Sequence, residues 1–270
     1  MRVPFVDLQA DHKSIEGDLK IRFEKILLES QFIGGDYVKQ FEQEFAKIHK
    51  ADSCIAVNSG TDALILGVRA LGLSSQDEVL VPANTFIATA LGATENNLKP
   101  VFVDCDMHDF GLNISDLKNK INNRTKAIIA VHLYGQPDKL DEIKRVIKQS
   151  GKKIYFIEDA AQAHGAEYKK KPVGTHGIFS TFSFYPAKNL GALGDGGALL
   201  TNDTKLAKKY RLLREYGQVK KYYHEILGVN SRLDSMQAAF LLIKLQHLSY
   251  WNKKRQSLAR LYTQQLSNIP

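Results

Sequence analysis

From residue 53 onward, short apolar and β-branched runs alternate with segments that carry apolar residues at helical spacing. The runs lack polar alternation, which is typical of strands buried on both faces of a sheet. They are CIAVN at 54–58, EVLVP at 78–82, PVFVD at 100–104, KAIIAVHLYG at 126–135, KIYFIED at 153–159 and IFSTFSFY at 178–185. We therefore predict an α/β fold with a mostly parallel sheet covered by helices, in which ligands bind at the carboxyl ends of the strands.

Helical patterns flank this region on both sides. Before it, apolar spacing predicts one helix over 11–28 and a second over 36–49, and after it helices are predicted at 203–216 and 235–266. We interpret 1–50 as an N-terminal helical arm, 51–248 as the large α/β domain, and 249–270 as the start of a further C-terminal region.

The composition excludes several classes of protein. The 270 residues, 44% of them hydrophobic, can bury a core without disulfides. Cys54 and Cys105 lie far apart without CxxC partners, so we predict no disulfide framework and no metal site. The formal charge of +8 suits an anionic partner, but no nucleic-acid-binding module accompanies it. We find neither a signal peptide nor a membrane span and expect a cytoplasmic protein with no membrane partner.

The stretch STFSFYPAKNLGALGDGG at 180–197 carries the first candidate for chemistry. Its one lysine, Lys188, follows an apolar run that Pro186 ends, because proline cannot donate to a strand ladder. Four glycines follow around Asp195 and allow the main chain to approach its neighbours closely. The pattern favours a lysine amine held still at the exit of a strand, although a lysine in a flexible surface turn is the alternative.

Two further groups of polar residues follow predicted strands. Glycine and hydroxyl residues at 58–62 precede a helix, where free N–H groups and the helix dipole form an anion site, unless Thr61 is a simple N-cap. Asp159 ends a buried strand, where a carboxylate requires a cation. It is therefore half of a structural ion pair or the partner of a protonated ligand.

These three features together match one common cofactor. Pyridoxal 5′-phosphate requires a phosphate site, to which the Ser183 hydroxyl is a further candidate donor, a carboxylate for its ring nitrogen and a lysine amine. The sequence therefore predicts that Lys188 and Asp159 meet at one cofactor.

Four ordered motifs resemble one family of enzymes. The chain is similar to the DegT/DnrJ/EryC/StrS-type sugar aminotransferases, which are pyridoxal phosphate enzymes of fold type I, from about residue 5 to residue 248. The resemblance implies the large domain of an aspartate aminotransferase-like fold, with a mixed, mostly parallel sheet of the seven-stranded type. The motifs are GTDAL at 60–64, EDAAQAHGA at 158–166, SFYPAKNLGALGDGG at 183–197 and GVNSRLDSMQAA at 228–239.

The resemblance also implies roles for single residues. Lys188 bonds the cofactor and moves a proton as the base, which requires a lowered pKa, while Asp159 pairs with the pyridine nitrogen. Gln162 contacts the ring or its hydroxyl. His164 and Tyr185 are candidates for contacts with the sugar.

The remaining implied contacts involve the phosphate and a second subunit. Gly60, Thr61 and Ser183 hold the phosphate, and Phe86 covers the ring face. Asn230 reaches the phosphate of the neighbouring subunit, so the resemblance implies a homodimer with shared active sites. Arg232 is a candidate for contact with the nucleotide or phosphates of the substrate.

The expected reaction is transfer of an amino group, with glutamate as the implied donor, to a nucleotide-linked keto-sugar. The motifs are most similar to members that aminate C3 of a dTDP- or UDP-linked sugar, and a 4-keto sugar is the alternative. Family dehydratases have histidine in place of the lysine, which Lys188 argues against. Family members continue past the position of Pro270 into a small C-terminal domain. We therefore expect that domain to be missing or truncated, and a catalytically impaired assembly subunit is a further alternative.

Overall fold

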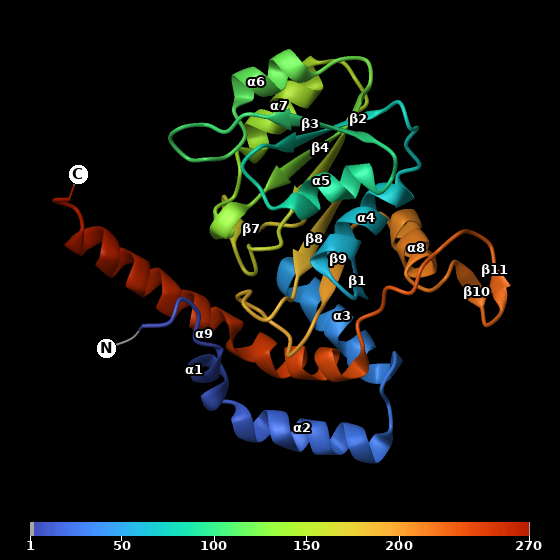
Figure 1. Cartoon of the computed structure of the whole chain (residues 1–270), viewed down its shortest axis with the longest axis vertical. Coiled ribbons are helices and arrows are strands. Elements are labelled where there is room, and N and C mark those ends of the chain that lie inside the picture. The colour runs from blue at the N-terminus through green and yellow to red at the C-terminus, as the bar shows by residue number, and fades with distance from the viewer. Residues whose placement is uncertain (1–2, 270) are drawn as a thin grey trace.

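One mixed sheet forms the centre of the protein (Figure 1). The computed structural model describes residues 3–269, and in these residues the sheet has seven strands in the order β1-β9-β8-β5-β4-β2-β3. Every neighbouring pair from β8 to β3 is parallel, whereas β9 is antiparallel to both of its neighbours. The strands are β1 (Ser53–Val57), β2 (Glu78–Pro82), β3 (Lys99–Val103), β4 (Thr125–Val131), β5 (Tyr155–Asp159), β8 (Phe179–Ser183) and β9 (Gly197–Thr201). The predicted mostly parallel α/β fold is confirmed.

Helices cover both faces of this sheet. Successive side chains along a strand point to opposite faces, and on each face they pack with helices in a buried apolar cluster. In β5, Phe156 packs toward one face and Ile157 toward the other. The face of Ile157 is covered by α4 (Gly60–Ala70), α5 (Ile87–Thr94) and α8 (Thr204–Leu213). The opposite face is covered by α3 (Gly35–His49), α6 (Ile114–Lys120), α7 (Leu140–Gln149) and α9 (Ser235–Gln265).

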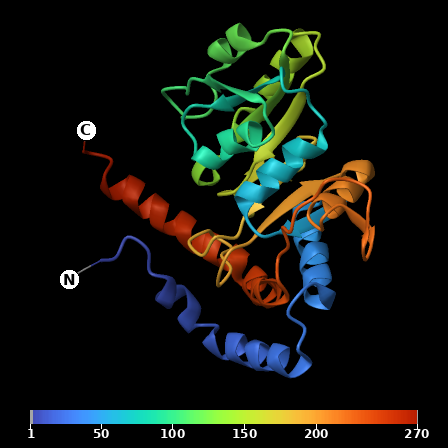
Figure 2. The same ribbon diagram turned by 45° about the vertical axis from the view of Figure 1, so that its right-hand side comes forward.

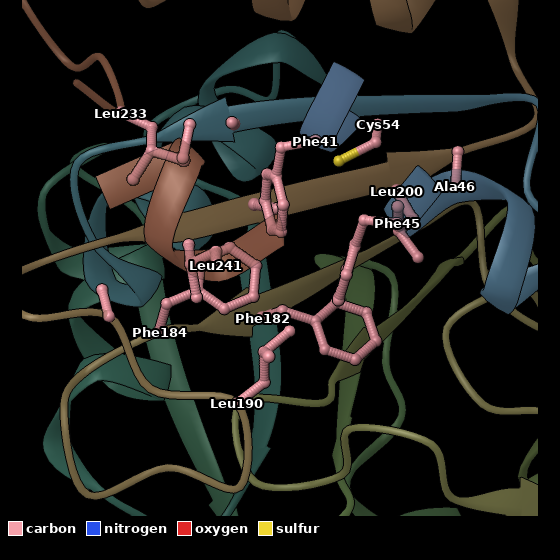
Figure 3. Close-up of a cluster of buried hydrophobic side chains, with 14 of the residues drawn as sticks. Phe41, Phe45, Ala46, Cys54, Phe182, Phe184, Leu190, Leu200, Leu233 and Leu241 are labelled. Atoms are coloured by element: carbon pink, nitrogen blue, oxygen red, sulfur yellow. The ribbon is translucent and has the colours of Figure 1, made fainter. Parts of the chain in front are cut away.

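Aromatic packing fixes the strand that leads to Lys188 (Figure 3). The ring of Phe45 on α3 meets the rings of Phe182 and Phe184 edge-on, with centroids 5.1 and 5.2 Å apart. Such pairs contribute about 0.5–1.5 kcal/mol beyond the burial of their area. Because Phe184 is fully buried four residues before Lys188, the start of the lysine loop is anchored in the core.

The N-terminal helices differ from the sequence-based expectation. The predicted helix over 11–28 is two helices, α1 (Leu8–Lys13) and α2 (Glu16–Glu29), with a break at Ile15. Ile15 is buried against α9, and its backbone departs from the helical conformation at the break (φ −122°, ψ 9°). The boundary at residue 50 also separates α3 from the domain whose core it shares.

Helix α9 is one continuous helix across the boundary proposed at residue 248. Its C-terminal half extends beyond the sheet, with α1 beside it (Figure 2). No helix among residues 3–269 combines the length and apolarity needed to cross a bilayer. The remaining elements are one 3-10 turn and two short antiparallel strand pairs. They are η1 (Leu133–Gly135), β6 (Glu167–Tyr168) with β7 (Lys171–Pro172), and β10 (Gln218–Lys220) with β11 (Tyr223–His224).

Candidate active site

A cavity of about 470 Å³ opens at the carboxyl ends of the strands. Loops after β1, β2, β4, β5 and β8 reach it, because parallel strands end at the same edge of a sheet. Eight of the residues that the sequence singled out line it: Gly60, Thr61, Phe86, Asp159, Gln162, Ser183, Tyr185 and Lys188. The fold therefore brings together motifs that are far apart in the chain.

Lys188 stands in a tightly wound loop beyond β8. Its amide donates to the carbonyl of Tyr185 at 2.8 Å, and a Cβ on Gly191 would lie only 2.2 Å from the carbonyl oxygen of Pro186. Glycine is therefore required where the loop closes on itself. Burial lowers the pKa of the Lys188 amine, and the carboxylate of Asp159 acts in the opposite direction. A lowered pKa makes the neutral amine more available near pH 7.

The turn between β1 and α4 forms an anion cradle. Ser59, not Thr61, is the N-cap, since its side chain accepts a hydrogen bond from the Asp62 amide at 3.0 Å. The interpretation of Thr61 as the cap was therefore wrong, and the amides of Gly60 and Thr61 at the helix start are left to a ligand. A Cβ on Gly60 would lie 2.7 Å from Cβ of Ser183, so the helix start and the Ser183 hydroxyl face one small space.

Asp159 is a buried carboxylate, only 5% exposed. Its Oδ2 accepts a hydrogen bond from Thr89 Oγ1 at 2.8 Å, and its Oδ1 accepts one from the Ala161 amide at 3.1 Å. Burial raises its pKa, and the two hydrogen bonds oppose that shift. Among residues 3–269 no lysine or arginine forms an ion pair with it, so the structural ion pair left open by the sequence is not formed.

The comparisons with known proteins agree with this site. The model of the DegT/DnrJ/EryC1/StrS aminotransferase family matches residues 13–270. The chain belongs to this family. The dTDP-3-amino-3,4,6-trideoxy-alpha-D-glucose transaminase of Streptomyces venezuelae is 42% identical over 269 residues, which cover 100% of this chain and 70% of that protein. The UDP-N-acetyl-3-dehydro-alpha-D-glucosamine 3-aminotransferase of Acidithiobacillus ferrooxidans is 41% identical over 267 residues, 99% of this chain and 72% of that protein.

Solved structures show the same fold. The crystal structure of S. venezuelae DesV has a TM-score of 0.96 and 42% identity, covering 100% of this chain and 72% of that chain. NtdA of Bacillus subtilis, solved with bound PMP, has a TM-score of 0.92 and 33% identity, covering 99% of this chain and 61% of that chain. The protein thus has the fold-type-I architecture of pyridoxal phosphate-dependent aminotransferases.

The cavity of this aminotransferase fits pyridoxal phosphate. The amides at the start of α4 and the Ser183 hydroxyl suit a phosphate, whereas the buried Asp159 carboxylate suits a cationic ring nitrogen. Gln162 Oε1 accepts a hydrogen bond from the Tyr134 amide at 2.8 Å, which leaves the amide NH₂ of Gln162 as a donor. The donor set therefore matches the separate parts of the cofactor.

Phe86 and Tyr185 present aromatic rings to the cavity. Phe86 precedes α5 and is 67% exposed, and Tyr185 is 56% exposed. A large apolar side chain exposed at the cavity wall can bury its surface against a ligand. This fits the contact with the ring face that the resemblance implied for Phe86.

His164 does not line this cavity, although Ser183 and Lys188 lie near enough to influence its pKa. Its side chain is 1% exposed and packs against Phe182 and Phe184 in the aromatic core, and it does not line the cavity that holds Lys188. Burial, together with the nearby His49, lowers its pKa to about 3. The position of its motif beside Asp159 suggested a contact with the sugar, but the chain after β5 turns this ring into the core. We therefore do not retain His164 as a substrate contact.

Asn230 and Arg232 also lie outside the cavity. Asn230 is exposed and pairs through its backbone with Glu215. The guanidinium of Arg232 forms an ion pair with Glu215 at 2.7 Å and lies over the ring of Tyr216. Neither side chain lines the cofactor cavity of its own chain.

Thr85 and Thr89, the hydroxyl residues behind Asp159, were not predicted as part of the site. Thr85 lines the cavity and Thr89 is completely buried. The available signal was their spacing of four residues at the start of a predicted helix, which places both hydroxyls on one face.

Proposed function

We propose that this aminotransferase transfers an amino group from an amino acid, glutamate, to the keto group of a nucleotide-linked sugar. The observation that carries this proposal is the arrangement of Lys188, Asp159 and the start of α4 around one cavity. The names of the two sugar aminotransferases that are similar over nearly the whole chain support the substrate class.

The mechanism follows from the charges of the site. When bound, pyridoxal phosphate supplies an electron sink that makes the α-proton of an amino acid acidic. Asp159 is suited to keep the ring nitrogen protonated, because its carboxylate is buried and, among residues 3–269, forms no ion pair with a lysine or arginine. Lys188, with its lowered pKa, is suited to take up and return a proton at the substrate carbon.

The phosphate cradle and the ring contacts hold the reacting atoms in place. The amides of Gly60 and Thr61 bind the phosphate at the positive end of the α4 dipole. Gln162 would orient the ring through its free NH₂, and Phe86 would cover one ring face and exclude water. Tyr185, exposed at the cavity wall, is the remaining candidate for contact with the sugar.

We further propose amination at C3 of a dTDP- or UDP-linked sugar. Both relatives described above carry a 3-amino or 3-dehydro sugar in their names, one dTDP-linked and one UDP-linked. The formal charge of +8 favours association with an anionic diphosphate.

The substrate test uses purified protein with pyridoxal phosphate, glutamate and a panel of 3-keto and 4-keto sugars on dTDP, UDP and GDP. We expect formation of 2-oxoglutarate and the amino sugar with a 3-keto substrate, and none with Lys188→Ala. Faster turnover of a 4-keto sugar would replace the C3 assignment. Cofactor binding without turnover of any donor or sugar would favour an assembly subunit.

We propose that two copies form a homodimer with shared active sites. Asn230 is exposed and does not line the cavity of its own chain, which suits a contact with the cofactor phosphate of a second copy, with Arg232 near the substrate phosphates. Exposed apolar side chains, Ile87 just after Phe86 in the chain and Leu227 three residues before Asn230, provide surface for such an interface.

Mixing two inactive variants tests the shared site. Lys188→Ala and Asn230→Ala each cripple both sites of a homodimer, but a heterodimer has one site with both lesions and one with neither. After subunit exchange we expect up to about half of the normal activity per heterodimer. A mixture that exchanges subunits and is no more active than its components would contradict the placement of Asn230.

A further inference from the structure

Two threonine hydroxyls form a directed chain that ends on the carboxylate of Asp159. Thr89 Oγ1 donates to Asp159 Oδ2 at 2.8 Å, and Thr85 Oγ1 lies 2.8 Å from Thr89 Oγ1. A hydroxyl has one proton, and Thr89 uses it for the carboxylate. Thr85 is therefore the donor of the second hydrogen bond, and both O–H dipoles point toward Asp159.

This chain fixes the plane of the carboxylate. Thr89 holds one oxygen and the Ala161 amide holds the other at 3.1 Å, so rotation of the Asp159 side chain would break a hydrogen bond. Thr89 is fully buried, so its hydroxyl is held in place by the surrounding core. The remaining lone pairs of the carboxylate are thus presented in one orientation to the cavity that both Asp159 and Thr85 line.

The hydroxyl also offsets the cost of a charge in this place. Burial raises the pKa of Asp159, whereas the hydrogen bond from Thr89 is the largest influence that lowers it. Hydrogen bonds to charged groups are stronger than those between neutral groups, and their loss from a buried group is correspondingly costly. Lys188 and His132 also lower the pKa of Asp159, but less than the Thr89 hydrogen bond does, so Thr89 is the main side chain that favours the ionised form.

We propose that Thr89, supported by Thr85, is a positioning residue that holds Asp159 ionised and correctly oriented for the ring nitrogen of the cofactor. This inference rests on the proposed function, because it assigns Asp159 to that nitrogen. The turn at the start of α5 then has two roles. Its threonines support Asp159, and Phe86, which lies between them in the chain, lines the same cavity.

The first experiment measures the affinity of the apo protein for pyridoxal phosphate. Thr89→Val replaces the hydroxyl by a methyl group of similar size, Thr89→Ser keeps the hydroxyl, and Thr94→Val removes a hydroxyl on the same helix that bonds the Ala90 carbonyl instead. Loss of one hydrogen bond to a charged group predicts at least about tenfold weaker binding for Thr89→Val. Thr89→Ser and Thr94→Val are expected to bind like the unaltered protein.

The second experiment asks whether Thr89 acts through Asp159. In an Asp159→Asn background, Thr89→Val should cause no further loss of affinity, because the carboxylate is already absent. With a deaza analogue of the cofactor that lacks the ring nitrogen, the unaltered protein and Thr89→Val should bind equally. Thr85→Val should show a smaller loss of affinity, which again depends on the Asp159 carboxylate and on the ring nitrogen. It replaces Thr89→Val in both experiments if Thr89→Val fails to fold.

The outcomes distinguish a failure of the proposed function from a failure of the role proposed for Thr89. Failure of the unaltered protein to bind pyridoxal phosphate would contradict the proposed function itself. Normal binding by Thr89→Val would overturn the role of Thr89 alone. An equal loss in the Asp159→Asn background, or with the deaza analogue, would show that Thr89 only shapes the cavity wall and would also overturn it.

Discussion

Removal of the buried imidazole of His164 should make the protein less sensitive to acid. The pKa of this side chain is lowered from 6.5 to about 3 in the folded protein, chiefly by burial. Above pH 6.5 the group is neutral in both states and contributes no pH dependence. As the pH falls below 6.5, the unfolded chain binds a proton that the folded chain does not, so stability is lost until the pH nears 3.

The size of the effect follows from this interval. Each bound proton changes the free energy of unfolding by about 1.4 kcal/mol per pH unit. At pH 5 the loss from His164 is therefore about 2 kcal/mol relative to pH 8. His49, whose pKa burial lowers to about 4, adds a similar loss that remains in the variant.

The assay is urea unfolding of His164→Leu and the unaltered protein at pH 8 and pH 5, at one protein concentration. Any packing defect of the variant lowers the free energy of unfolding at both pH values. The diagnostic quantity is therefore the change in the free energy of unfolding between pH 8 and pH 5. His108→Leu, at an exposed position, controls for the loss of one imidazole. An identical pH dependence in His164→Leu would refute the buried neutral histidine. A raised KM for the sugar at pH 8 would restore the substrate contact that the structure argues against.

Two further variants test the cavity. Asp159→Asn should retain the cofactor through its phosphate contacts but lose turnover by orders of magnitude, each factor of ten being about 1.4 kcal/mol of barrier. Cofactor content and kcat measure these two effects. A near-normal kcat would make Asp159 a structural residue. Gly60→Ala should weaken binding of pyridoxal phosphate, because the new Cβ would lie 2.7 Å from Cβ of Ser183. Gly17→Ala, where a Cβ meets nothing within 4 Å, should bind normally, and equal affinities of the two variants would place the phosphate elsewhere.

Much of the site could be predicted because its chemistry lies at strand ends. The apolar runs predict the strands, and the loop of Lys188 is identified by its proline and glycines. Glu158 and Asp159 are adjacent carboxylates at the end of β5, and their contacts distinguish them. The Glu158 carboxylate is occupied by His132 and by backbone amides including that of Gly174, whereas Asp159 faces the cavity.

Other features depend on tertiary contacts that a single sequence does not show. The segment that forms β9 was not among the predicted strands, and its place between β1 and β8 is set by pairing with both. The break before α2 exists because Ile15 packs against α9, far away in the chain. The direction of the His164 ring likewise depends on the aromatic core contributed by α3 and β8.

The central claim is that Lys188 is the residue that bonds the cofactor. The most direct measurement is borohydride reduction of the protein loaded with pyridoxal phosphate, followed by peptide mapping with mass spectrometry. We expect a single phosphopyridoxyl group on Lys188 and its loss in Lys188→Ala. Labelling of a different lysine, or no labelling of a protein that is folded and saturated with the cofactor, would contradict it.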